Sequence, residues 1–307
     1  MKLEGKKTIC VLGNAAIERK IFLKSFPPKN WEATIDKEYV NVGGSGAHSA
    51  AALSILGFKV YMIAQVGTHA DGRKILSELE KTNVDTYYVL RSDLTSTNFI
   101  SAFDKNQKRI MFIRPIKQND EALFSNLSRS LELADILVIC PTTPNLVMRA
   151  ARLANSLKKL VIISPQAAFF DQSPKWIEEF LGFADMIFLN ETEICKYAHL
   201  NNLGEATERV RFNNWQIVVV TRGINGCMVI SDNGVLQRPA KRARYGTVVD
   251  PSGAGDSFMA GFIWSLKKSR NLVDAADTGA IAGLATSLRT ELSEKCFSLK
   301  EHLEMRT

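Results

Sequence analysis

The sequence predicts an α/β fold in which a mostly parallel sheet is sandwiched by helices and carries a small β-sheet lid. Short apolar runs alternate with helical stretches through the second half of the chain, as expected for parallel strands joined by crossover helices. Of the 307 residues, 46% are hydrophobic, which is enough for a sizeable core, and no linker or repeat interrupts them. We therefore expect a single domain over residues 1–307.

The first half of the chain combines strands with one clear glycine turn. The run TICVL is apolar and suits a buried strand. The segment GGSGAHSAAALSILG has the small residues and the spacing of a turn that leads into a helix. The expected elements are a strand at Thr8–Leu12, extended segments around Lys20–Phe26 and Ile35–Val42, the helix after Gly44, a strand at Lys59–Val66, a helix at Gly72–Lys81 and a strand at Thr86–Leu90.

A hairpin is predicted at Asn98–Arg114, where TNFISAF and RIMFIRP alternate in polarity on either side of DKNQK. Neither this hairpin nor the early extended segments fit the strand–helix alternation. We expect these lid segments, about 19–42 and 96–115, to pair into a separate small sheet that covers a ligand. An apolar sheet face without helices over it also suits a second subunit, so a homodimer through the lid sheet is expected.

The second half of the chain follows a regular strand–helix order. A hairpin with its turn at Asp232–Gly234 interrupts this order, and two long helices end the chain. The expected elements are strands at Ile136–Cys140, Leu160–Ser164, Met186–Leu189 and Ile217–Thr221, the hairpin in GCMVISDNGVLQRP, and helices from Ala254 and over Val273–Leu288.

Charge and cysteine content narrow the classes of function. The net charge is +7, but the basic residues are dispersed, and the densest cluster, Arg238–Gly246, has no interleaved aromatic residues, so we expect a solvated loop and no nucleic-acid partner. The apolar runs are too short to cross a membrane, and a cytoplasmic location is expected. Five scattered cysteines without a C-x-x-C pair indicate reduced thiols, and Cys195 with His199 is a weak metal signal.

The segment VVDPSGAGDSFMAGF, which begins at Val248, contains the most informative loop of the sequence. Gly253 and Gly255 allow a tight turn, and a helix that starts near Ala254 would offer unpaired N–H groups and the positive end of its dipole. Such a helix start is an anion site, most often for phosphate. Asp256 is itself negative, so its presence in this loop indicates a group that handles a proton.

Other nucleotide signatures fit poorly. The P-loop pattern and the protein-kinase motifs H-R-D and D-F-G are absent. A dinucleotide-binding interpretation of Gly44-x-Gly46-x-x-Ser49 lacks the third glycine, and the strand that follows ends in Gly67 rather than an acidic residue. A nicotinamide-dependent oxidoreductase is therefore disfavoured.

The loop DPSGAGD resembles the D-[ST]-x-G-A-G-D signature of the ribokinase-like (PfkB) carbohydrate kinase family, with Pro251 in place of Thr or Ser. Upstream, VNVGGSGAHSAAALSILG and VGTHADGRKILSELEKTNVDT are similar to two other family segments. NETE, at residues 190–193, matches the family pattern N-x-x-E, and VTRGINGCMV resembles the family's nucleotide-contacting strand and turn. These matches occur in family order from residue 9 to about residue 290.

The resemblance implies a Rossmann-like ribokinase fold and an ATP-dependent transfer of the γ-phosphoryl group to a hydroxyl of a small sugar, as in ribokinase or fructokinase. It implies that the N–H groups of Gly253, Ala254 and Gly255 form an anion hole and that Asp256 accepts the proton of the attacking hydroxyl. Because a helix N-terminus favours a carboxylate, Asp256 is expected to be ionised and only weakly basic. A nucleoside kinase of the same family and a non-catalytic ligand-binding member remain the alternatives.

Metal sites are implied at two positions. In the family, the residues that match Asn190 and Glu193 help to hold Mg²⁺ through water, although N-x-x-E is also a helix capping box. Asp250 and Ser252 match positions that bind a monovalent cation such as K⁺ in some members.

ATP contacts are implied at the end of the strand Ile217–Thr221 and in the turn after it. Two of these residues are glycines, and an ordinary tight turn explains a glycine equally well. The residues concerned are Thr221, Gly223 and Gly226.

The acceptor pocket departs from the family pattern at two places. Glu18 takes the position of the usual Asp near the end of the first strand, and His48 replaces the Asn that follows the glycine pair. Gly43 and Gly44, the pair itself, are retained. We expect these four residues to bind the substrate, and the two replacements leave open which sugar or nucleoside is bound.

Overall fold

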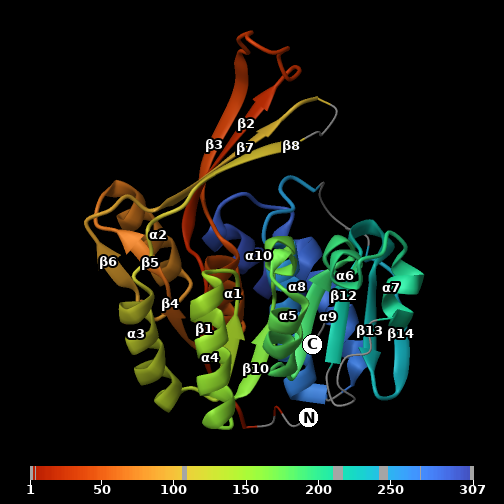
Figure 1. The fold of residues 1–307 in the computed structure, drawn as a ribbon. Helices are drawn as coiled ribbons and strands as arrows, with labels where there is room; N and C mark the ends of the chain where they lie inside the picture. The colour runs from red at the N-terminus through yellow and green to blue at the C-terminus, as the bar shows by residue number, and fades with distance from the viewer. Residues whose placement is uncertain are drawn as a thin grey trace.

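The computed structural model describes Leu3 and residues 5–105, 109–209, 217–241, 248–269 and 271–304. Within these residues the central sheet has eight strands (Figure 1). All neighbouring pairs are parallel except β12–β13 and β13–β14, which are antiparallel and lie at one edge of the sheet. The predicted mostly parallel sheet is therefore confirmed. In spatial order the strands are β14 (Gly234–Arg238), β13 (Cys227–Ser231), β12 (Ile217–Thr221), β11 (Met186–Asn190), β10 (Leu160–Ile163), β9 (Ile136–Ile139), β1 (Thr8–Leu12) and β4 (Lys59–Ile63).

Helices cover both faces of this sheet. Successive residues of a strand point to opposite faces, so each strand contributes apolar side chains to the clusters on both sides. In β1, Ile9 and Val11 belong to one hydrophobic cluster, whereas Cys10 and Leu12 belong to the other. The first cluster includes α1 (Ser45–Ile55), α2 (Ala70–Lys81), α8 (Ala254–Ser269), α9 (Leu272–Thr286) and α10 (Leu292–Glu304). The second includes α3 (Asp120–Leu133), α4 (Pro144–Ser156), α5 (Pro174–Gly182), α6 (Glu191–Ala198), α7 (Leu203–Arg209) and the 3₁₀ turn η1 (Ala167–Asp171).

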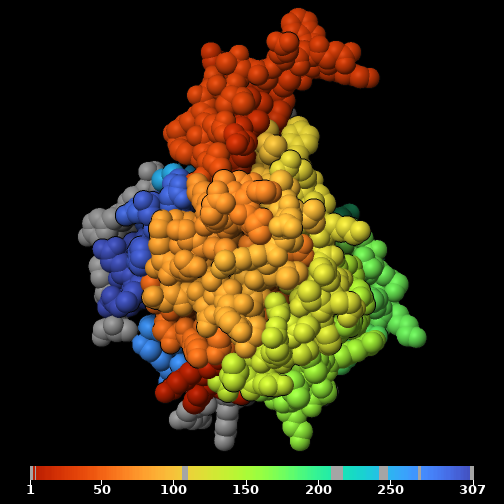
Figure 2. All heavy atoms as spheres, turned by 90° about the vertical axis from the view of Figure 1, so that its left-hand side faces the viewer, coloured from red at the N-terminus to blue at the C-terminus, as the bar shows by residue number. Residues whose placement is uncertain are grey.

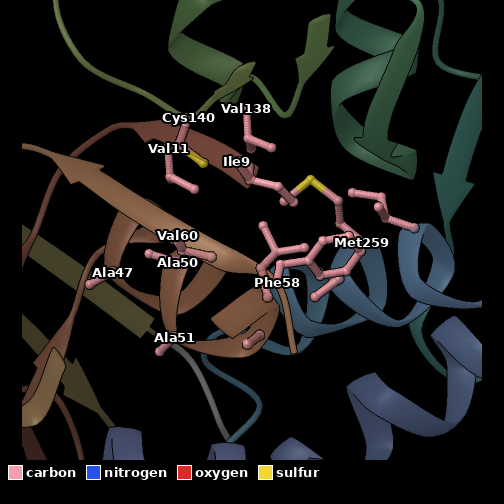
Figure 3. Packing of buried hydrophobic residues seen from close by; sticks show 14 of the residues in the cluster. Ile9, Val11, Ala47, Ala50, Ala51, Phe58, Val60, Val138, Cys140 and Met259 are labelled. Atoms are coloured by element: carbon pink, nitrogen blue, oxygen red, sulfur yellow. The ribbon is translucent and has the colours of Figure 1, made fainter. Parts of the chain in front are cut away.

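The core beside α1 is packed closely around small residues. Figure 3 shows Val11 and Val60 of the sheet with Ala50 of α1, and Met259 of α8 near Ile9. Alanine side chains let a helix backbone approach the sheet, and the start of α1 lies beside the start of α8, where Ser45 and Ser49 contact Asp256. The two glycine loops of the sequence thus meet in space.

A second sheet forms the lid, in the order β3-β2-β7-β8. It consists of β2 (Ala16–Leu23), β3 (Ile35–Gly43), β7 (Thr97–Phe103) and β8 (Arg109–Arg114), so the predicted small sheet and its hairpin are confirmed. The sheet rises from the central body in Figure 1, and the side view in Figure 2 shows its N-terminal part standing clear of the body. Part of the DKNQK turn, residues 106–108, lies outside the described residues.

Two predicted strands differ in the structure. The expected strand Lys59–Val66 is divided into β4 and β5 (Gln65–Gly67), and β5 pairs with β6 (Leu90–Ser92) in a separate two-stranded sheet. The strand expected at Thr86–Leu90 is wrong over most of its length. The Asp85 side chain accepts a hydrogen bond from the Tyr87 N–H at 2.9 Å, which turns the chain, as aspartate often does.

The remaining predictions concern the C-terminal hairpin and the surface. The hairpin β13–β14 is confirmed, with its turn at Asp232 and Asn233. Residues 242–246 of the basic cluster lie outside the described residues, so its interpretation as a solvated loop stays a prediction. None of the helices in the described part of the chain has the length and apolarity needed to span a membrane.

Candidate active site

A cavity of about 460 Å³ lies between the lid sheet and the carboxyl edge of the central sheet. This edge is where α/β sheets bind ligands. Of the predicted site residues, the cavity wall contains Glu18, Gly44, His48, Ser252, Gly253 and Asp256. The other residues of the wall are Asn14, Ser45, Thr97, Phe99, Met111, Ile113, Pro115, Ile116, Gln118, Pro141, Thr142, Thr143, Gln166, Ala168 and Phe169.

Asp256 lies in the first turn of α8 and faces two serines of α1. The hydroxyls of Ser45 and Ser49 both donate to Asp256 Oδ1, at 2.5 and 2.9 Å. Burial raises the pKa of Asp256 to about 6, although the two hydroxyls and the charge of Lys295 act in the opposite direction. The expectation of a weakly basic carboxylate is therefore wrong, because desolvation outweighs the favourable helix start.

The loop before α8 needs a glycine at position 253 for a local reason. Gly253 has φ +77°, and a Cβ atom there would lie 2.5 Å from Nδ1 of His48. The histidine ring therefore packs directly on the loop, which only glycine permits. The Ala254 N–H donates to the carbonyl of Pro251 at 3.1 Å, whereas Gly255 is exposed and has open space around it.

His48 lies near the start of α1 and is only 6% exposed. Burial, together with the positive charges of Lys295 and Lys20, lowers its pKa to about 3. His48 is therefore neutral near pH 7 and can offer the cavity a hydrogen bond but no charge. It lines the cavity and also supports the loop, so the pocket and structural interpretations of this residue are compatible.

Glu18 projects from β2 into the cavity wall and is held from two sides. Its Oε2 lies 3.3 Å from the ammonium of Lys20, and its Oε1 accepts a hydrogen bond from the Ser101 hydroxyl at 3.3 Å. Gly43 does not line the cavity, but a Cβ atom there would lie 3.2 Å from Cβ of Glu18. Gly43 thus leaves room for the glutamate. Gly44 has φ +97° and packs on the Asn14 backbone in the same way.

Asn190 and Glu193 form the capping box of α6, as one of the two interpretations predicted. The Asn190 side chain accepts from the Glu193 N–H at 2.9 Å, and Glu193 Oε2 accepts from the Asn190 N–H at 2.8 Å. Burial raises the pKa of Glu193 to about 7, and the charge of Asp256 adds to this rise. Their role in holding Mg²⁺ stays a prediction. Among the described residues, no cluster of three or more acidic, histidine or cysteine side chains could hold a metal.

The predicted nucleotide residues lie beside this cap, outside the cavity wall. Thr221 ends β12 and is the register partner of Asn190 on β11. The 3₁₀ turn η2 (Gly223–Asn225) follows, with φ +54° at Gly223 and +87° at Gly226. A Cβ atom on Gly226 would lie 2.0 Å from the Arg238 carbonyl oxygen, so turn geometry alone explains this glycine. Contact of these residues with a nucleotide stays a prediction.

Asp250 is buried, and its two carboxylate oxygens are paired with two lysines. Burial would raise its pKa, but the ammonium groups of Lys295 and Lys20 override this and hold the pKa at about 2. Their Nζ atoms lie 2.9 and 2.6 Å from the carboxylate. Ser252 lies beside this pair, and its hydroxyl accepts from Lys20 at 2.8 Å. The structure therefore places lysines where the resemblance implies K⁺.

Among the polar residues of the site that were not predicted from the sequence, three have a distinct role. Asn14 follows β1 at the carboxyl edge, and its buried Oδ1 finds no hydrogen-bond partner within the described residues. A buried acceptor in a cavity wall indicates a ligand donor. Ser45 and Ser49 are four residues apart on α1, a spacing that puts both on one helix face. These two signals, a polar residue after a strand and a serine pair on the pocket helix, were present in the sequence.

Comparison with known proteins gives a consistent result. A model of the pfkB family carbohydrate kinases matches residues 6–294. The nucleoside kinase of Methanothermobacter thermautotrophicus is 24% identical over 269 residues, which cover 87% of this chain and 84% of that protein. The ribokinase of Haemophilus influenzae is 22% identical over 310 residues, covering 97% of this chain and 98% of that protein.

A solved structure shares the fold. The ribokinase of Cryptococcus neoformans var. grubii serotype A in complex with ADP has a TM-score of 0.81 at 18% identity, over 98% of this chain and 100% of that chain. At this identity the likeness establishes the fold, and the family match carries the classification. The resemblance seen in DPSGAGD is thus confirmed across nearly the whole chain. The chain belongs to the pfkB family of carbohydrate kinases, which are phosphotransferases.

Proposed function

We propose that this chain transfers the γ-phosphoryl group of ATP to a hydroxyl of a small sugar, with Asp256 as the proton acceptor. The observation that carries the proposal is the position of Asp256, which lies in the wall of the cavity and in the first turn of α8. Ser45 and Ser49 hold Oδ1, which orients the carboxylate toward the cavity. With a pKa of about 6, the group is deprotonated at pH 7 yet basic enough to take a proton.

The start of α8 would stabilise the transferred group. Phosphoryl transfer depends on positioning and on neutralising charge, and backbone N–H groups at a helix start do both. Because the Ala254 N–H donates to Pro251, we assign the anion hole first to the N–H groups of Gly253 and Gly255. Ala254 would join them only after leaving that carbonyl.

The nucleotide would lie over the ends of β11 and β12. The ribokinase of similar fold that was solved with ADP supports a nucleotide site in this chain. We assign the nucleotide contacts to Thr221, Gly223 and Gly226 and the Mg²⁺ contact to Asn190 and Glu193. These oxygen donors fit a hard cation that keeps its water, and the bound ion would neutralise phosphate charge.

The acceptor would be held by Glu18 and His48, with the unpaired Oδ1 of Asn14 as a further contact. Hydroxyl groups of a sugar can donate to a carboxylate or amide oxygen and can exchange a hydrogen bond with a neutral imidazole. The cavity volume of about 460 Å³ is within the range usual for small-molecule sites.

A nucleoside is the second candidate acceptor, and a specific observation favours it. The apolar part of the cavity wall comes from Phe99, Met111 and Ile113 of the lid sheet and from Phe169 of η1. A nucleobase could pack on such a wall, whereas a small free sugar would leave much of it uncovered. The relative from Methanothermobacter thermautotrophicus carries the name nucleoside kinase.

The test is acceptor-dependent release of ADP from ATP and Mg²⁺ across a panel of free sugars and nucleosides. We expect turnover with at least one sugar. The kcat/KM of the best nucleoside, compared with that of the best sugar, tests the second candidate function. The Asp256→Asn variant is the matched control. If the protein binds ADP but turns over with no member of the panel, the non-catalytic alternative is correct instead.

We also propose that the lid sheet forms a homodimer. Side chains of β8 alternate, so Met111 and Ile113 line the cavity, at 43% and 54% exposed, while Ile110 and Phe112 lie on the other face, at 44% and 58% exposed. Burying these apolar side chains against a second copy would remove them from water. Sedimentation of the wild type and of Phe112→Ser tests this proposal, and a wild-type monomer at micromolar concentration would contradict it.

A further inference from the structure

A buried cluster of four charged side chains lies behind the loop that precedes α8. Lys20 of β2 and Lys295 of α10 are only 5% and 1% exposed. Lys20 Nζ lies 2.6 Å from Oδ1 of Asp250, and Lys295 Nζ lies 2.9 Å from Oδ2. Glu18 supplies the second negative charge, with Oε2 at 3.3 Å from Lys20. Two positive and two negative charges therefore balance at a largely buried site.

The ammonium of Lys295 is bound as a small cation would be. An ammonium has three N–H donors, and three oxygens of the loop surround this one. They are Oδ2 of Asp250 at 2.9 Å, the Asp250 carbonyl at 3.1 Å and the Ser252 carbonyl at 2.6 Å. Carboxylate and carbonyl oxygens are the donors that hard cations prefer. These contacts tie α10 to the backbone on both sides of Pro251, just before Gly253.

The residues present do not fit the K⁺ ion that the resemblance implies at Asp250 and Ser252. Three of the oxygens that would bind it are already directed at Lys295, and the Ser252 hydroxyl accepts from Lys20 at 2.8 Å. A further monovalent cation would also be repelled by both ammonium groups, and such repulsion is strong where water is excluded.

We propose that Lys295 is an internal substitute for the monovalent cation and that this chain is independent of K⁺. Lys295 acts as a positioning residue: it fixes the Asp250 and Ser252 carbonyls and, through them, the loop that carries Gly253. The effect on catalysis rests on the proposed kinase function, whereas the effect on thermal stability does not.

The first experiment uses the wild-type protein. Its kcat, KM for ATP and Tm are measured in KCl, NaCl and tetramethylammonium chloride at equal ionic strength, so that only the cation changes. We expect the kcat values in the three salts to agree within about 2-fold, which is well below the 10-fold change that corresponds to about 1.4 kcal/mol. A K⁺ site filled 100-fold above its Kd would instead raise Tm by about 5 °C for a chain of this size. Such a rise, or a 10-fold activation by K⁺, would overturn the proposal.

The second experiment creates the missing cation site. In Lys295→Ala the loop oxygens lose their ammonium, so we expect a lower Tm and a kcat reduced by about 10-fold or more, as for other misplaced catalytic groups. K⁺ or NH₄⁺ should restore part of both, and tetramethylammonium, which is too large, should not. Lys300→Ala is the matched control, because this lysine is on the same helix with its side chain half exposed. Its Tm should not depend on the cation.

Each outcome decides the proposal. A Lys295→Ala variant with wild-type Tm and kcat in tetramethylammonium chloride would show that the ammonium does not hold the loop. A destabilised variant that K⁺ and NH₄⁺ cannot restore would show that the oxygens do not form a cation site. If the variant does not fold, the wild-type salt series still decides. If no acceptor is found, the Tm values test the internal cation independently of the kinase function.

Discussion

Replacing Asp256 by Asn should abolish most of the activity while making the protein more stable. The amide oxygen of asparagine can still accept from Ser45 and Ser49, so the geometry of the site is retained. The variant has no base, and lost general-base catalysis usually lowers kcat by about 10²–10⁴-fold. ATP affinity should change little because the backbone N–H groups of the loop remain.

The gain in stability follows from the pKa. Burial raises the pKa of Asp256 from 3.8 to about 6 in the folded protein. At 1.36 kcal/mol per pKa unit, the ionised group destabilises the folded state by about 3 kcal/mol. Because the folded pKa is the higher one, the contribution of Asp256 to stability is fully present below pH 4 and is lost as the pH rises through 6. The neutral asparagine avoids this loss, so at pH 8 its Tm should exceed that of the wild type by about 5 °C.

The assay combines thermal unfolding with kinetics between pH 5 and pH 8. The Tm advantage of Asp256→Asn should shrink as the pH falls below 6, and wild-type kcat/KM should fall by about 10-fold per pH unit there. Asp274→Asn is the matched control, since Asp274 is an exposed residue of the first turn of α9. The Asp274→Asn variant should lose about 0.3–1 kcal/mol of folding stability and keep its activity. An Asp256→Asn variant that retains more than about a tenth of wild-type kcat would refute the base assignment.

Three further predictions test other parts of the site. Glu193→Gln keeps the capping box, because glutamine also serves at that position, so Tm should hold while the Mg²⁺ concentration for half-maximal rate rises; a lower Tm with unchanged Mg²⁺ dependence would leave only a helix cap. Gly253→Ala should lower kcat and should lower Tm by the equivalent of more than about 1 kcal/mol, because its methyl group would meet His48. Gly182→Ala, which places its methyl group in open space, should be neutral. A Gly253→Ala variant with the same Tm as Gly182→Ala would contradict this packing. The double variant Glu18→Asp, His48→Asn should change the kcat/KM ratio of the two best acceptors by about 10-fold, and an unchanged ratio would remove both residues from substrate recognition.

Local patterns in the sequence were enough to predict the order of the elements and the position of the glycine loop before α8. Apolar runs and the 3.6-residue helical period depend on neighbouring residues, so β1, β12 and the start of α8 at Ala254 were predicted within a residue or two. The lid was predicted from the same local signals, because its strands break the strand–helix alternation. The strand expected at Thr86–Leu90 failed where the Asp85 side chain turned the chain.

The electrostatics of the site depend on contacts between residues that are far apart in the sequence. The pKa of Asp256 depends on burial and on serines more than 200 residues earlier in the chain. The partners of Asp250 are equally remote, since Lys20 comes from the lid sheet and Lys295 from the last helix. Desolvation and Coulomb forces depend on distance in space, and no local pattern records that distance. The loop before α8 could therefore be recognised from its sequence, whereas the contact of the Lys295 ammonium with that loop could not.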